Sequence, residues 1–291
     1  MTTAPAPLAA PRREHRFYLL ALLPFVLVVL CFELLPLATV VVRSFAAEDG
    51  GITLQHYVNI FSKRLYRQSV LNSIWVSVFS ALIGVAVAFF GAKAAHGATG
   101  RLRNFFMSVL NMTSNFAGIP LAFSYIILMG NVGVLVVLGR QFGIGFLADF
   151  NLYSLNGLLL TYVYFQIPLA TLLLIPTFNG LRPQWRESVS LLGGGPWSYW
   201  WRVALPTLLP SLLGTFSVLF ANAIAAYATA YALLQNNFSL LPIRISEQFV
   251  GDVVQHKEFG SALSVVLMVL LILVSVINNL IARGQRGGSA K

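Results

Sequence analysis

The segment from Arg182 to Pro206 combines residue types that rarely occur together in one loop: an acid, arginines, three consecutive glycines, tryptophans and three prolines. Its charged residues exclude an ordinary lipid-facing helix, and its regularly spaced apolar residues give it one apolar side. We predict two short helices, the first over Glu187–Leu192 and the second beginning at Pro196. The three glycines form the turn between them, where a positive φ costs little. Such a segment is suited to anchoring at a membrane surface or to binding a partner.

No nucleotide-binding or catalytic motif accompanies this segment. The run Gly193-Gly194-Gly195 lacks the lysine that follows the glycines of a phosphate-binding loop. The four histidines lie outside the apolar runs, in no HExxH pattern, and no nucleophile elbow is present. The single cysteine, Cys31, excludes an internal disulfide and a paired-cysteine metal site. We therefore expect no enzyme activity, no bound metal and no cofactor in this chain.

The composition of the chain predicts membrane-spanning helices, and these must hold the segment 182–206 in place. Hydrophobic residues make up 57% of the 291 residues and charged residues only 10%, which leaves too little polar surface for a water-soluble globule. About 20 helical residues cross a hydrocarbon core. We predict an all-α integral membrane protein with six transmembrane helices, over Phe17–Val42, Val70–Ala92, Phe105–Met129, Leu155–Thr177, Thr207–Leu234 and Ala262–Ala282. The transmembrane domain is then 17–282, between an N-terminal tail (1–16) and a C-terminal tail (283–291).

The basic residues predict the orientation of these spans. The N-terminus, the loops 93–104 and 178–206, and the C-terminus hold three lysines or arginines each, twelve in all, against seven in the other loops. The richer side faces the cytoplasm. Both termini and the loop 182–206 are therefore expected to be cytoplasmic. The net charge of +10 comes from these scattered clusters, so it indicates membrane orientation and not nucleic-acid binding.

Polar residues inside the spans are candidates for a translocation path. Glu33 is the only ionisable residue well inside a span, and a charge there is expensive enough to suggest a function, such as attracting a cationic substrate. The alternative is that it reaches the headgroups or bonds a neighbouring helix. Polar stripes also occur in the third, fourth and fifth spans, where packing between helices is the alternative to a path. The candidates in these stripes are Asn111, Asn115, Tyr162, Gln166, Asn222 and Thr229.

The spacing of the loop 182–206 resembles the EAA loop of binding-protein-dependent ABC importer permeases. Glu187 is followed after six residues by Gly193 and, after nine further residues, by Val203-Ala204-Leu205-Pro206. The family pattern is Glu-Ala-Ala, three residues, Gly, nine residues, Ile-x-Leu-Pro. Ser188 and Val189 replace the two alanines and Val203 replaces the isoleucine, while the spacing is intact.

The resemblance implies a type I ABC importer permease fold in the cell (inner) membrane, with a cytoplasmic coupling helix between spans four and five. Its partners would be a second permease subunit, two ATPase subunits that bind the ATP, and an external substrate-binding protein. The residues expected to contact the ATPase are Glu187, Gly193, Pro196, Trp197, Arg202, Leu205 and Pro206. The segments Ile52–Tyr57, Ala226–Tyr231 and Leu241–Arg244 look most like spermidine/putrescine permeases, and the alternatives are other solutes of the same branch: phosphonates, thiamine, sulfate and iron. The alternative function is an ATP-independent secondary transporter or channel, although such carriers generally place several ionisable groups near the midplane.

Overall fold

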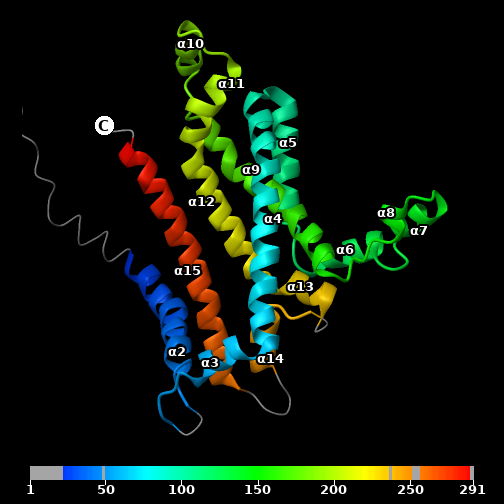
Figure 1. The fold of residues 1–291 in the computed structure, drawn as a ribbon, viewed down its shortest axis with the longest axis vertical. Coiled ribbons are helices and arrows are strands. Elements are labelled where there is room, and N and C mark those ends of the chain that lie inside the picture. Colours follow the sequence, from blue (N-terminus) through cyan, green and yellow to red (C-terminus); the bar gives the residue numbers. More distant parts are fainter. Residues whose placement is uncertain (1–21, 48–49, 236–237, 251–255, 289–291) are drawn as a thin grey trace, which may run out of the picture.

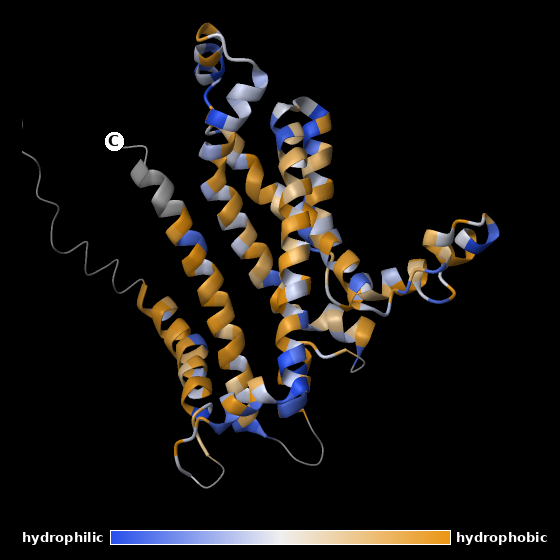
Figure 2. Cartoon of the chain, in the orientation of Figure 1, coloured by the Kyte–Doolittle hydropathy of each residue, from blue (hydrophilic) through white to orange (hydrophobic). Residues whose placement is uncertain are grey.

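The computed structural model describes residues 22–47, 50–235, 238–250 and 256–288, with side chains described up to residue 281. Within these ranges the regular secondary structure is helical, apart from one isolated bridge between Ala46 and Ile52, and turns and loops connect the helices. Helices long and apolar enough to cross a membrane are Leu22–Arg43, Arg64–Gly97, Ile119–Gln141, Leu155–Phe178, Pro196–Ile224 and Lys257–Ile281. The predicted all-α membrane fold with six spans is therefore confirmed, and Figure 2 shows these helices as largely hydrophobic. The start of the first predicted span and the two terminal tails lie outside the described residues or side chains.

The centre of the bundle is formed by α4 (Arg64–Gly97), α9 (Leu155–Phe178) and α12 (Leu205–Ile224). Small residues let these helices approach closely. A Cβ added at Gly84 would lie 2.9 Å from Leu219 Cδ2 and 3.2 Å from Gln166 Cβ, so any side chain where the three helices meet would require Leu219 and Gln166 to shift. Since lipid provides no hydrophobic driving force between helices, this close contact is what stabilises their packing.

The remaining long helices and the short outer helices complete the bundle. α15 (Lys257–Gly288) packs against α12 and against α2 (Leu35–Arg43), the last part of the first helix. α3 (Gln55–Ser62) and α14 (Leu241–Phe249) pack beside the start of α15. Figure 1 shows α3 and α14 at one end of the molecule, with α10 (Pro183–Leu191) and α11 (Pro196–Tyr199) at the opposite end.

Two π-helical turns each lie directly before a proline. η1 (Leu30–Leu34) precedes Pro36, and η2 (Trp200–Ala204) precedes Pro206. In each turn the N–H of the next residue donates to the carbonyl five positions earlier, as Leu205 does to Trp200. The wider turn removes the clash between the proline ring and the preceding turn. Pro206 therefore lies within one helical stretch, which runs from Pro196 to Ile224.

The third predicted span, Phe105–Met129, is not one helix. α5 (Gly100–Ser114) ends before a break at 115–118, and α6 (Ile119–Met129) follows. Gly118 has φ +75°, a conformation that few residues other than glycine adopt, and Pro120 stands in the first turn of α6. The break therefore has a local cause that the sequence contains.

The fifth predicted span, Thr207–Leu234, is also interrupted. α12 ends at Ile224, and α13 (Tyr227–Leu234) begins after Ala225 and Ala226. No glycine or proline occurs at this point, so the interruption depends on contacts with other helices. The hydroxyl of Tyr162 donates to the carbonyl of Ala226 at 2.7 Å, and α13 packs against α6.

The segment between α6 and α9 contains α7 (Val134–Gln141) and α8 (Gly145–Ala148). We expected it to be a loop at the outer face. Figure 1 shows α7 and α8 projecting sideways from the bundle, at a level between the two ends of α4.

Candidate functional site

The loop 182–206 begins with α10, which ends in a glycine cap. Gly193 has φ +77°, and its N–H donates to the carbonyl of Ser190 at 3.1 Å. The N–H of Gly194 donates to the carbonyl of Val189 at 2.8 Å. This pair of bonds is the Schellman arrangement, which satisfies the last carbonyls of a helix and reverses the chain. The predicted glycine turn is therefore present, and its shape is set by backbone hydrogen bonds.

The second part of the loop is continuous with the membrane helix. Pro196 stands in the first turn of α11, where its missing N–H costs nothing, as the sequence predicts. α11 continues through η2 into α12 without a break. The rings of Trp197 and Trp201 lie one turn apart, with centroids 5.6 Å from each other. α11, η2 and α12 thus form one continuous helical stretch.

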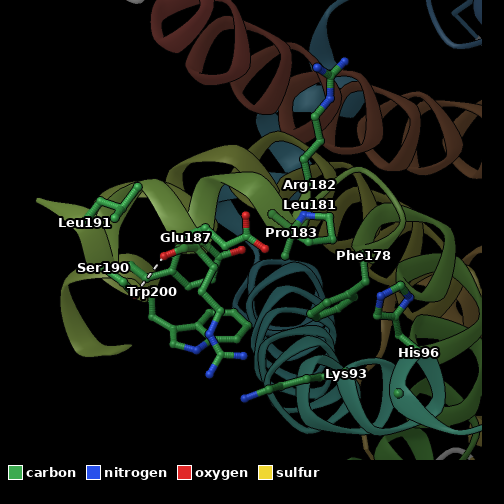
Figure 3. Close-up of a pocket in the computed structure, with 13 residues that line it drawn as sticks. Lys93, His96, Phe178, Leu181, Arg182, Pro183, Glu187, Ser190, Leu191 and Trp200 are labelled. Carbon is green, nitrogen blue, oxygen red and sulfur yellow. Dashed lines mark hydrogen bonds between the residues drawn. The ribbon is translucent and has the colours of Figure 1, made fainter. Parts of the chain in front are cut away.

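A cleft of about 960 Å³ lies between this loop and the end of α4 (Figure 3). The ammonium of Lys93 lies 4.4 Å from the centre of the Trp200 ring, a cation–π contact that ties α4 to η2. The sequence pattern did not single out Lys93, since it is remote from the loop along the chain. The residues lining the cleft are Lys93, His96, Gly97, Phe178, Leu181, Arg182, Pro183, Arg186, Glu187, Ser190, Leu191, Tyr199 and Trp200.

The loop presents uncovered apolar side chains at the end of the molecule. Trp197 is 75% exposed, and Leu191 and Leu192 are 88% and 87% exposed. The residues expected from the sequence to contact the ATPase include Trp197 but neither leucine, although all three belong to the same surface. Glu187 and Arg202 are also exposed, whereas Leu205 is half-buried at the start of α12. The surface therefore combines apolar and charged groups, as protein-binding surfaces do.

Three of the predicted path residues are buried and join helices. Tyr162 holds the interruption after α12 through the Ala226 carbonyl, and Thr229 donates to the carbonyl of Gly118 at 3.3 Å. Gln166 donates to Ser80 Oγ at 2.6 Å, while its Oε1 has no hydrogen-bond partner. Through Gly118 and Thr229 the two helix interruptions meet side by side.

Three other predicted path residues are exposed. Asn111 and Asn115 lie one turn apart at the end of α5, and each amide donates to the carbonyl four residues earlier at 2.8 Å. Asn222 is exposed near the end of α12. Glu33 is exposed in η1, on the first helix, whose α2 portion packs against α15, so the structure does not bring it to the interruptions.

Comparison with known proteins identifies the family. Residues 80–287 match the family described as binding-protein-dependent transport system inner membrane component, and this match includes the whole loop 182–206. The chain belongs to this family. It is therefore a multi-pass inner-membrane component of a binding-protein-dependent transport system, and the relatives named below are transport permeases.

Relatives of this permease carry different solutes. The thiamine transport system permease protein of Escherichia coli is 27% identical over 161 residues, covering 55% of this chain and 30% of the relative. A probable sulfate permease of Prototheca wickerhamii is 27% identical, covering 56% and 66%. The chain thus spans less than two thirds of the length of these relatives. The spermidine/putrescine permease of Haemophilus influenzae is 27% identical over 256 residues, covering 84% and 87%.

Solved structures share the permease fold. A bacterial ABC transporter involved in the import of the acidic polysaccharide alginate aligns with a TM-score of 0.72 at 15% identity, covering 94% of this chain and 96% of that chain. A bacterial alginate ABC transporter in complex with an alginate pentasaccharide-bound periplasmic protein aligns with a TM-score of 0.74 at 14% identity, covering 94% of this chain and 95% of that chain.

Proposed function

We propose that this permease forms the translocation path for a small hydrophilic solute and is driven by a separate ATPase subunit that docks on the loop 182–206. The observation that supports this most is the unbroken helical stretch from Pro196 to Ile224. It links the exposed loop at one end to the helix interruption at 225–226. A movement imposed on the loop is therefore transmitted to the interruption.

The loop is suited to receive such a movement because its backbone is held by the glycine cap while its side chains are free to contact a partner. Lys93 and the aromatic rings beside it connect the loop to α4. Glu187, Gly193, Pro196, Trp197, Arg202, Leu205 and Pro206 are the residues we assign to the docking surface and its support. ATP is bound by the partner.

The path follows the two interruptions. Irregular backbone at membrane depth is tolerated where it lines a cavity or is buried in protein. We assign Asn111, Asn115 and Asn222 to the polar wall, and Tyr162 and Thr229 to the supports that hold the interruptions in place. Gln166, on the same predicted path, joins α9 to α4 through Ser80. Glu33 lies apart and acts on a cationic solute at long range.

For the solute we favour a polyamine. The spermidine/putrescine permease of Haemophilus influenzae aligns over most of both chains, unlike the thiamine and sulfate permeases. In the importer, an external substrate-binding protein delivers the solute and a second permease subunit completes the path.

Co-purification and reconstitution test this function. The tagged permease, expressed with the genes beside its own, should bring down an ATPase subunit, and proteoliposomes should import labelled putrescine only with ATP inside and binding protein outside. Uptake by the permease alone would instead identify an ATP-independent carrier.

Cysteine labelling tests on which side of the membrane the loop 182–206 lies. In a Cys31→Ser background, a cysteine at Ile52, which is 91% exposed, should react with an impermeant maleimide in spheroplasts. A cysteine at the similarly exposed Leu192 should react only after lysis. Labelling of Leu192 from outside would exclude docking of a cytoplasmic ATPase on this loop.

A further inference from the structure

The cleft between α4 and the loop 182–206 lies where two membrane helices reach their first charged residues. No charged residue occurs in 68–92, and Lys93 follows directly on α4. None occurs in 150–181, and Arg182 follows shortly after the end of α9. Both residues line the cleft. Because uncharged helical runs of this length cross the hydrocarbon core, we expect the cleft to lie at the level of the lipid headgroups.

The charged side chains that line the cleft are mainly positive. Lys93, Arg182 and Arg186 are exposed cations, against the single carboxylate of Glu187. None of the three cations forms an ion pair with another residue that the structure describes. Figure 3 shows the side chains of Lys93 and Arg182 extending away from each other, so Arg182 lies at the rim of the cleft. The cleft therefore carries an excess of positive charge that an anion would neutralise.

Aromatic side chains line the cleft beside these charges. Tyr199 is 8% exposed, and its hydroxyl forms no hydrogen bond with a described residue. Trp200 contacts the ammonium of Lys93 and also Phe89, with ring centroids 5.9 Å apart. Tyrosine and tryptophan are enriched at the headgroup level of membranes, where an apolar ring and a polar tip are both satisfied. The Tyr199 hydroxyl is therefore available to donate to an acceptor in the cleft.

An uncovered apolar surface continues from the cleft toward the membrane centre. Phe90 is 70% exposed and lies about one helical turn before Lys93 on α4. Its ring contacts Phe89, with centroids 5.5 Å apart, and Phe89 in turn contacts Trp200. A free phosphate ion would use only the charges of the cleft. A lipid whose phosphate lies at Lys93 would use the charges and also place an acyl chain along this apolar surface.

We propose that the cleft binds the phosphate headgroup of an anionic phospholipid, with Lys93 and Arg186 at the phosphate. An acyl chain lies along Phe90, and Arg182 meets the headgroup from the rim. Basic pockets between membrane helices recognise such headgroups by their charge, and arginine can bind two phosphate oxygens at once. The bound lipid joins the end of α4 to α10 and so holds the loop 182–206 beside the bundle. Its binding is independent of the proposed function, whereas its effect on an ATPase rests on that function.

Native mass spectrometry of the purified permease in detergent tests the site. The probes are phosphatidylglycerol, phosphatidylcholine and inorganic phosphate. We expect phosphatidylglycerol to bind about tenfold more tightly than phosphatidylcholine, and excess inorganic phosphate not to displace it. Lys93→Gln with Arg186→Gln should weaken binding of phosphatidylglycerol roughly tenfold or more, because two cations at the phosphate are lost. Arg101→Gln with Arg103→Gln is the matched control, since it removes the same charge from exposed positions on α5 that do not line the cleft.

Three results of this experiment would overturn the lipid site: equal binding of the two lipids, displacement by inorganic phosphate, or an equal loss of binding in both double variants. Release of the bound lipid on addition of the ATPase subunit would also overturn it, because the ATPase would then fill the cleft.

Reconstitution tests what the lipid does in the importer. In phosphatidylcholine vesicles, added phosphatidylglycerol should raise solute-stimulated ATP hydrolysis at least about twofold for the wild type and for the Arg101 and Arg103 control. An equal rise in the Lys93 and Arg186 variant would contradict this role. If the ATPase co-purifies but the lipid binds without Lys93 and Arg186, the lipid site is wrong and the proposed function stands. If the lipid binds as expected and no ATPase co-purifies, the proposed function is wrong and the lipid site stands.

Discussion

The loop 182–206 and the paired interruptions at 115–118 and 225–226 are both places where helices stop, but they are held in different ways. In the loop, backbone hydrogen bonds around Gly193 set the shape and most side chains are exposed. At the interruptions, buried side chains such as Tyr162 and Thr229 bind the backbone of another segment. Backbone capping frees side chains to contact a partner, whereas within the membrane the side chains themselves must satisfy the irregular backbone. The two regions should therefore respond to different mutations.

The largest loss of stability is expected at the interruptions. Tyr162→Ala removes a 3% exposed ring and its hydrogen bond to Ala226, and such a cavity costs about 3–5 kcal/mol. Tyr231→Ala, at a 46% exposed position, should have little effect. The thermal unfolding midpoint in detergent, measured for each purified variant, compares the two losses of stability. Equal midpoints for the two variants would show that side chains do not hold the interruption.

A smaller, local effect is expected from backbone strain in the loop. Gly193→Val places a β-branched residue at φ +77°, which costs roughly 1–2 kcal/mol. Gly195→Val is the control, because Gly195 has φ −82° and open space around its Cβ position. Only Gly193→Val should reduce the amount of ATPase that co-purifies, and both variants should insert normally. A similar loss from Gly195→Val would argue that any added side chain is harmful, whatever the backbone conformation.

The buried hydrogen bond from Gln166 to Ser80 joins α9 to α4. Its Oε1 is buried without a partner, so Gln166→Leu removes an unsatisfied acceptor and should change stability by less than about 1 kcal/mol. Ser80→Ala should be more harmful, since it leaves the whole amide of Gln166 without a partner. Thermal unfolding compares the two variants. A larger loss of stability for Gln166→Leu than for Ser80→Ala would show that Gln166 stabilises the bundle by more than its hydrogen bond to Ser80.

Among these substitutions, Glu33→Gln should have the smallest effect, and that effect should be on uptake of the solute. Because it lies on the first helix, away from the interruptions, Glu33→Gln should only slightly raise the putrescine concentration needed for half-maximal uptake, and high salt should remove the difference. A complete loss of uptake would place Glu33 in direct contact with the solute.

The sequence predicted the loop more completely than it predicted the interruptions, for a physical reason. A glycine turn and a helix-starting proline act locally, so Gly193 and Pro196 could be interpreted from their positions alone. The interruption at Gly118 also has a local signal, whereas the one at Ala225–Ala226 has none and depends on Tyr162, 64 residues away. The contact of Lys93 with Trp200 likewise joins distant segments. The polar stripes were visible in the sequence, but which members are buried was decided by how the helices pack.

The most direct test of the account is ATP hydrolysis by the reconstituted importer, with and without solute-loaded binding protein. Glu187 is exposed on α10, so Glu187→Lys should leave insertion and folding intact while reversing a charge on the docking surface. The account predicts normal membrane levels of this variant and loss of the solute-stimulated hydrolysis, because the two sites are coupled through this contact. Full stimulation in the variant would show that the loop 182–206 anchors the helices and does not drive them.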